Sequence, residues 1–119
     1  MANLNVQLAI KSNTALSDAT DISVTNDIKS SGDVALQRIA VSTSGKLVLS
    51  SAEYGKSYVY VLNTDTTLDI TLESAASGGT VFMDLAPGEI GYFPWNGTAD
   101  IYGVAASGTP VLEIAIFES

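Results

Sequence analysis

The chain has 119 residues and a formal net charge of −8, with no cysteine and no histidine. This length suffices for one domain with its own core, and the missing residue types exclude disulfides, Cys/His zinc sites, thiol nucleophiles and imidazole acid–base catalysis. No window approaches the roughly 18 apolar residues of a membrane span, and the start shows no basic segment followed by an apolar run. We therefore expect one domain over residues 1–119, made in the cytosol, with no membrane partner and no cofactor.

The charge is distributed unevenly. All five basic residues lie within the first 56 positions, where five acids balance them, whereas residues 57–119 carry eight acids and no base. Such a half cannot neutralise phosphates, which disfavours nucleic acid as a partner. The acidic half is either a solvated surface that maintains solubility or a face that docks on a basic partner.

The first half of the chain predicts short strands separated by polar breaks. Apolar residues alternate with polar ones over 4–10 and again over 22–28, a period of two that indicates half-buried strands. Residues 12–20 between them predict a loop, so that residues 1–20 form a strand plus an extended arm. The apolar parity then changes between Leu36 and Ile39, which predicts a β-bulge or a bend within one strand.

The second half has denser strand patterns. Five apolar runs precede a sixth at 111–117, with turn residues between all of them: 57–62, 67–72, 80–85, 90–95 and 99–105. Together with the first half, this spacing predicts an all-β fold with little or no helix. The expected architecture is a single antiparallel β-sandwich or jelly-roll-like barrel of about 8–10 short strands.

The sequence also predicts the conformation of two turns and the two faces of one strand. Pro87 and Gly88 predict a type II turn, because proline presets the first corner and glycine takes the positive φ of the second. Asn96-Gly97 favours a hairpin between its flanking strands. Residues 58–61 alternate tyrosine with valine, so one face of that strand should be aliphatic and the other should carry phenols that are wet or hydrogen-bonded.

Few residues suggest chemistry. Asp65 and Asp69 are four apart, and a carboxylate pair can serve glycoside hydrolysis, although two unrelated surface acids explain the spacing more simply. Calcium ligands could come from Asp18 with Asp21, or from Asn63 with Asp65, but neither pair has the length or glycine pattern of a known calcium loop. We therefore expect a protein that is not an enzyme and has no metal site.

Four aromatic residues are expected on two neighbouring strands joined by the Asn96-Gly97 turn. They are Tyr92, Phe93, Trp95 and Tyr102. Such a cluster can be core, an anchor in a protein interface or a flat platform for sugar rings, and the sequence leaves these alternatives open. The candidate interface residues are these four aromatic residues together with Lys11, Lys29 and Lys46.

Several stretches of the second half resemble small virion structural proteins of tailed bacteriophages. They contain a strand ending in an asparagine-containing turn, a Leu-x-Pro-Gly-Glu corner and a terminal hydrophobic strand, which recur in jelly-roll or β-sandwich head-decoration (cement) proteins. The resemblance is carried by residues 58–65, 68–70, 85–89, 101–106 and 111–118. It covers about half of the chain and does not extend to the first 56 residues.

The resemblance implies a non-catalytic virion protein that binds and stabilises a phage head. Its partners would be the major capsid protein and further copies of itself, in a homo-oligomer and more specifically a trimer. The charge distribution favours attachment through the N-terminal half, with the acidic half facing solvent. The alternative is a carbohydrate- or receptor-binding β-sandwich module of a phage tail or fibre, which would use Trp95 and its tyrosine neighbours.

Overall fold

The computed structural model describes residues 2–12, 20–30 and 34–119. These residues form ten strands, and they include no helix that is long and apolar enough to span a membrane. The chain divides into two compact units, Met1–Ser31 and Gly32–Ser119.

The first unit is a two-stranded antiparallel sheet of β1 (Ala2–Ser12) and β2 (Thr20–Ser30). Its register is unbroken, from Ala2 opposite Ser30 to Ser12 opposite Thr20. The alternation of apolar and polar residues explains both strands, because it gives the pair one apolar and one polar face. The predicted loop at 12–20 falls mainly on residues 13–19, which lie outside the described part of the chain.

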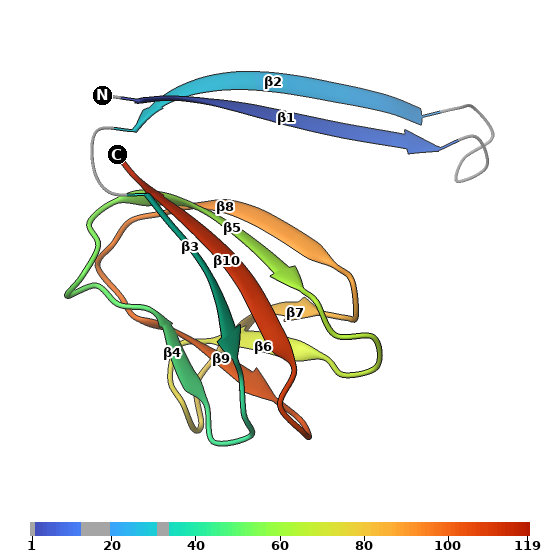
Figure 1. Ribbon diagram of the computed structural model, residues 1–119, viewed down its shortest axis with the longest axis vertical. Coiled ribbons are helices and arrows are strands. Elements are labelled where there is room, and N and C mark those ends of the chain that lie inside the picture. Colours follow the sequence, from blue (N-terminus) through green and yellow to red (C-terminus); the bar gives the residue numbers. More distant parts are fainter. Residues whose placement is uncertain (1, 13–19, 31–33) are drawn as a thin grey trace. The chain divides into compact units, whose positions relative to one another are not determined.

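The second unit is a sandwich of two four-stranded antiparallel sheets (Figure 1). One sheet has the order β3 (Val34–Ala40), β10 (Val111–Glu118), β5 (Ser57–Asn63), β8 (Ile90–Trp95). The other has the order β4 (Lys46–Leu49), β9 (Ile101–Ala105), β6 (Ile70–Glu73), β7 (Val81–Leu85).

Most connections within this unit cross from one sheet to the other. Of its seven consecutive strand pairs only β6 and β7 are neighbours in one sheet, so six connections cross. Eight strands that alternate between two sheets in this order form a jelly roll. The prediction of an all-β antiparallel sandwich is confirmed, although β1 and β2 form a sheet of their own outside it.

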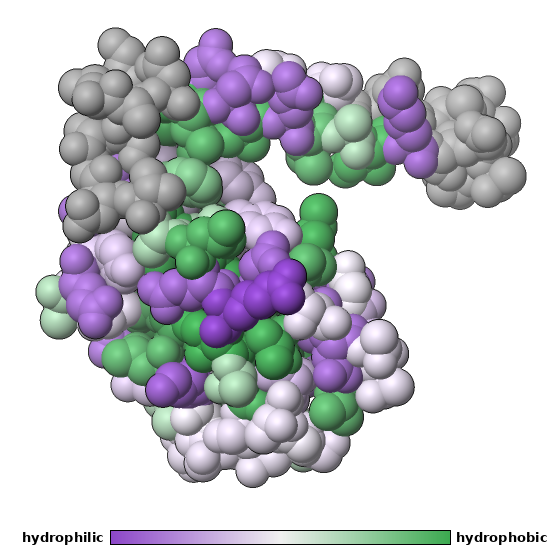
Figure 2. Space-filling view, viewed as in Figure 1, coloured by the Kyte–Doolittle hydropathy of each residue, from purple (hydrophilic) through white to green (hydrophobic). Residues whose placement is uncertain are grey.

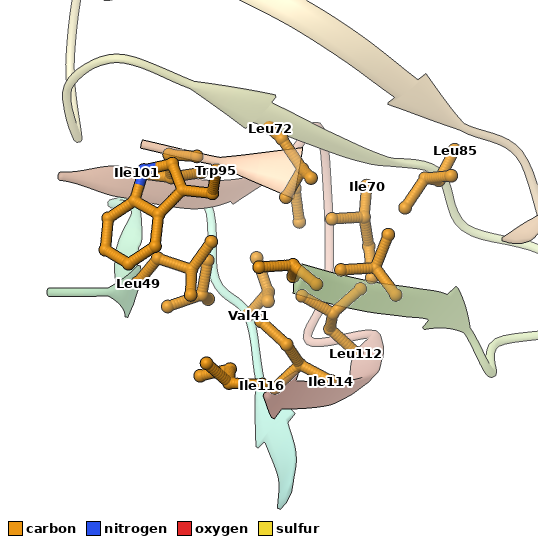
Figure 3. Close-up of a cluster of buried hydrophobic side chains, with 14 residues drawn as sticks. Val41, Leu49, Ile70, Leu72, Leu85, Trp95, Ile101, Leu112, Ile114 and Ile116 are labelled. Atoms are coloured by element: carbon orange, nitrogen blue, oxygen red, sulfur yellow. The ribbon is translucent and has the colours of Figure 1, made fainter. Parts of the chain in front are cut away.

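The core of the sandwich lies between the inward faces of the two sheets. Trp95 lies beside Leu49 and Ile101 at one end of the core, and Ile70 and Leu85 lie at the other end (Figure 3). Val59 and Val61 point inward from β5 and have no exposed area, as the valine–tyrosine alternation predicts. Burial of these side chains is the main stabilising contribution to the unit.

The turn at Pro87 and Gly88 links β7 in one sheet to β8 in the other. Gly88 has a φ of +79°, and the backbone N–H of Glu89 donates to the carbonyl oxygen of Ala86 at 3.0 Å. A positive φ after proline is the geometry expected of a type II turn. The Gly88 N–H also donates to the backbone carbonyl oxygen of Asn63 at 2.9 Å, which anchors this corner to the end of β5.

The prediction of a hairpin at Asn96-Gly97 is wrong. β8 pairs with β5 and β9 pairs with β4 and β6, so this turn carries the chain between sheets. Gly97 has a φ of +76°, and a Cβ there would overlap the backbone of Gly55. Glycine is therefore required here by a tight corner that packs against another loop, and not by a two-residue hairpin.

The prediction of a bulge or bend between Leu36 and Ile39 is also wrong. β3 pairs with β10 in continuous register from Val34 to Ala40. The register shifts of the sandwich occur elsewhere, between Leu47 and Leu49 and between Leu72 and Glu73. The parity changes in the sequence because Leu36 points away from the core, where it is 70% exposed.

Candidate interaction surface

The outward side of the β3–β10–β5–β8 sheet is the strongest candidate for a functional surface. Alternate residues of β5 and β10 are buried in the core, which leaves the residues between them on the opposite side. The cross-strand registers align these residues in three rows, which we call the outer face. The rows are Leu36–Ala115–Tyr60–Tyr92, Arg38–Glu113–Leu62–Ile90 and Phe117–Tyr58–Pro94.

The outer face is predominantly apolar. Leu36, Ile90 and Tyr92 are 70%, 66% and 43% exposed, and they come from both edges of the sheet. Figure 2 shows hydrophobic side chains around a hydrophilic group over β3 and β10. Antiparallel sheets that face water on one side normally alternate apolar-in with polar-out, so outward leucine, isoleucine and tyrosine side chains depart from that pattern. An exposed apolar patch of this kind indicates an interaction site.

The charged groups of the outer face neutralise each other. Arg38 Nη2 lies 3.0 Å from Glu113 Oε2, and the Arg38 Nε–H donates to the same oxygen at 3.1 Å. The Tyr60 hydroxyl donates to Glu113 Oε1 at 3.3 Å. Partial burial, followed by the Glu113 charge, raises the pKa of the Tyr60 phenol, so it stays protonated as a donor. A partner on this surface would therefore meet no unpaired charge.

The structure separates the four aromatic residues that the sequence predicts as one cluster. Trp95 is a core residue, 5% exposed, and its indole N–H donates to the carbonyl oxygen of Ala99 at 3.0 Å. Phe93 packs partly buried against the same core. Tyr92 lies on the outer face, opposite Tyr60, whereas Tyr102 lies on β9 in the other sheet, opposite Leu47. Among these residues, only Tyr92 belongs to the outer face.

The three candidate lysines do not form one patch within a single unit. Lys11 lies on β1 and is exposed. Lys29 lies on β2, and its side chain lies outside the described part of the structure. Lys46 begins β4 and lines a pocket of about 190 Å³ between β3 and β4, together with Gln37, Ile39, Leu47, Val48, Ser50, Glu53 and Tyr54. That volume is below the roughly 300 Å³ at which small-molecule sites begin.

The carboxylates considered for chemistry are used in turns. Asp65 Oδ2 accepts hydrogen bonds from the backbone N–H of Thr67 at 2.9 Å and of Leu68 at 2.7 Å. These bonds hold the pKa of the Asp65 carboxyl below its ordinary value. Asn63 Oδ1 accepts from the Asp65 N–H at 3.0 Å, as expected for a turn rich in such side chains. The described residues contain no group of three or more side chains suited to hold a metal, and Asp18 lies outside them.

Comparisons of the chain with protein-family models, curated proteins and solved structures found no match. The outer face therefore has to be interpreted from its own residues and geometry.

Sequence reasoning missed most of the outer face. The sequence analysis places Leu62 and Ile90 in predicted strands and Leu36 at a parity change, and it assigns none of them to an interaction surface. The available signal was the parity change at Leu36 and the apolar character of both faces of residues 58–62. Two apolar faces on one strand indicate either burial on both sides or an interface on one of them.

Proposed function

We propose that the protein is a non-catalytic structural protein of a virus particle, and more specifically a decoration protein that binds and stabilises the head of a tailed bacteriophage. The observation that carries the proposal is the apolar outer face, whose residues Leu36, Ile90 and Tyr92 a single chain leaves exposed. Exposed apolar patches mark surfaces that other proteins cover, so the chain is suited to work within a larger assembly.

The architecture supports the same proposal. Jelly rolls with two four-stranded sheets are common in viral capsid proteins and also occur in lectins. The fold alone therefore does not distinguish these two classes. The resemblance of residues 58–65 and 85–89 to head-decoration proteins points to the first of these classes. The partners would be the major capsid protein and further copies of this chain, as a trimer on threefold positions of the lattice.

One observation favours the alternative of a carbohydrate- or receptor-binding module of a tail or fibre. Tyr60 and Tyr92 lie directly opposite each other on the outer face, and adjacent phenol rings can stack on sugars. Three of the four rings first considered for such a platform are removed, because Trp95 is buried, Phe93 packs against the core and Tyr102 lies on the other sheet. We therefore rank this function second.

Mass spectrometry of the source particle, combined with immunogold imaging, tests the proposal. The expected result is labelling of the head, with a copy number that matches a class of positions on the capsid lattice. Heads that lack the protein should lose their contents at a lower temperature than complete heads, and the purified protein should restore the difference. Labelling of the tail together with binding on a glycan array would favour the alternative, and absence from the particle would refute both.

A further inference from the structure

The sheet of β1 and β2, which we call the arm, has one apolar and one polar face. On the apolar side the register places Leu4 opposite Ile28 and Leu8 opposite Val24. The polar side carries Asn5 opposite Asp27, joined by a hydrogen bond of 2.5 Å from Asn5 Nδ2 to Asp27 Oδ1. The two faces therefore require different surroundings, one apolar and one aqueous.

The two strands of the arm leave its apolar face incompletely covered. Leu8, Ile10 and Val24 are 49%, 49% and 53% exposed. A two-stranded sheet without further packing is at best marginally stable in water, so an arm with eleven-residue strands needs an apolar surface to lie on.

We propose that the arm of one copy packs its apolar face on the outer face of a second copy. Both surfaces are apolar, and each occurs once per chain. The apolar face of the arm carries aliphatic side chains and one amide, Asn26 opposite Val6, but no charge. The charges of the outer face, Arg38 and Glu113, are already paired with each other. Burial of an unpaired charge is the main penalty against association of apolar surfaces. The contact proposed here would bury none.

The size of the contact indicates a closed assembly. Strands of eleven residues span about 37 Å, and two strands cover a width of about 10 Å, so one arm would bury roughly 400 Å² on each partner. A single contact of roughly 800 Å² in total lies below the size of specific interfaces. Reciprocal exchange, in which every copy both gives and receives an arm, doubles the contacts per copy and closes the assembly. This inference does not depend on the proposed function, since exchanged arms would serve any assembly of this chain.

A pair of matched variants tests whether the apolar face of the arm holds copies together. Leu8→Asp with Val24→Asp places two charges at opposed positions of that face, and Gln7→Asp with Thr25→Asp places them at the adjacent opposed positions of the polar face. By light scattering at micromolar concentration, the wild type and the polar-face variant should be oligomers. The apolar-face variant should be a 12.3 kDa monomer under these conditions. Its dissociation constant for self-association should be at least 100-fold higher than that of the wild type. Its Trp95 fluorescence should remain that of the folded sandwich. A monomeric wild type, or equal oligomers of both variants, would overturn the proposal.

Cysteine cross-linking identifies the surface that receives the arm, and the absence of native cysteine keeps the background low. Differently tagged Leu8→Cys and Leu36→Cys chains, or Leu8→Cys and Ile90→Cys chains, are mixed and oxidised. We expect a covalent dimer of the two different chains at least 10-fold more abundant than with Gln7→Cys in place of Leu8→Cys. A single chain that carries both Leu8→Cys and Leu36→Cys is oxidised separately at high dilution. A disulfide closed within that monomer would show that the arm covers its own sheet and would refute exchange. Failure of both mixtures would refute the outer face as the receiving surface, and neither result bears on whether the protein is found on a phage head.

Discussion

The side-chain amide of Asn63 donates a 2.9 Å hydrogen bond to the backbone carbonyl oxygen of Leu85, which joins the last residue of β5 in one sheet to the last residue of β7 in the other. The same amide donates to the carbonyl oxygen of Leu68 at 2.8 Å. Asn63 has no exposed area, and its hydrogen bond to Leu85 is buried, whereas the one to Leu68 is partly buried. One polar side chain thus holds three segments of the sandwich together.

Replacement of this amide should be costly. Asn63→Ala removes a buried hydrogen bond to Leu85 and a partly buried one to Leu68, and we expect the free energy of unfolding to fall by about 3 kcal/mol. Asn96→Ala is the matched control, because the Asn96 side chain accepts an exposed hydrogen bond from the backbone N–H of Thr98. It should cost about 0.5 kcal/mol. Urea unfolding followed by Trp95 fluorescence measures both. Equal losses in the two variants would contradict a joining role for Asn63.

Trp95 and Tyr92 should respond differently to truncation, although they are three residues apart on β8. Trp95→Ala removes a core side chain that is 5% exposed, and we expect a loss of about 3–5 kcal/mol of folding stability. Tyr92→Ala removes a ring from the outer face and should cost the isolated chain less than about 1 kcal/mol. Thermal unfolding of both variants at low protein concentration measures the difference. An unchanged midpoint for Trp95→Ala would rule out its core role.

Stability should decrease in acid through Asp65. The backbone N–H groups of Thr67 and Leu68 lower the pKa of its carboxyl in the folded state, so its contribution is present above the ordinary aspartate pKa and is lost as the pH falls through the folded value. The window therefore lies below about pH 4. Asp65→Asn should flatten the decline within this window, and Asp84→Asn, which removes an exposed carboxylate of β7, is the charge-matched control. Chemical unfolding at a series of pH values measures the free energy of unfolding. A decline in Asp65→Asn that is as steep as in the wild type would contradict this role of Asp65.

Attachment to a capsid should depend on the basic residues of the N-terminal half. Reversal of Lys11, Lys29 and Lys46 to glutamate should slow binding to the native particle, with the largest effect at low ionic strength. The control reverses Asp69 and Asp84 to lysine, because both side chains are exposed, whereas Glu113 and Asp100 hold structural contacts to Arg38 and Ser51. Binding rates at two salt concentrations measure the effect. Normal binding of the lysine variant with loss in the acidic variant would reverse the proposed orientation.

Local patterns in the sequence predicted the strands and the fold class well. Period-two alternation places Val59 and Val61 in the core and Tyr60 on the other side, and the Pro87-Gly88 turn has the expected geometry. These features depend on neighbouring residues, so a sequence pattern is sufficient to identify them.

The pairing of the strands could not be predicted in the same way. Asn96-Gly97 has the composition of a hairpin turn, but whether the chain returns beside β8 or crosses to the other sheet depends on distant strands. Leu36 has the composition of a core residue, and only its partner Ala115, 79 positions later, shows that it points outward. The candidate surface was missed because it is assembled from four strands that are far apart in the sequence.

The position of β10 between β3 and β5 has a consequence for biosynthesis. Val34 pairs with Phe117, and Tyr58 pairs with the same residue from the other side, so the β3–β10–β5–β8 sheet lacks its second strand until the ribosome has translated past residue 117. Pairing across such sequence distances is slow, because the entropy cost of closing a long loop precedes the stabilising contacts. The sandwich therefore folds after most of its length has emerged, and chains terminated before residue 111 should be recognised by proteases as unfolded.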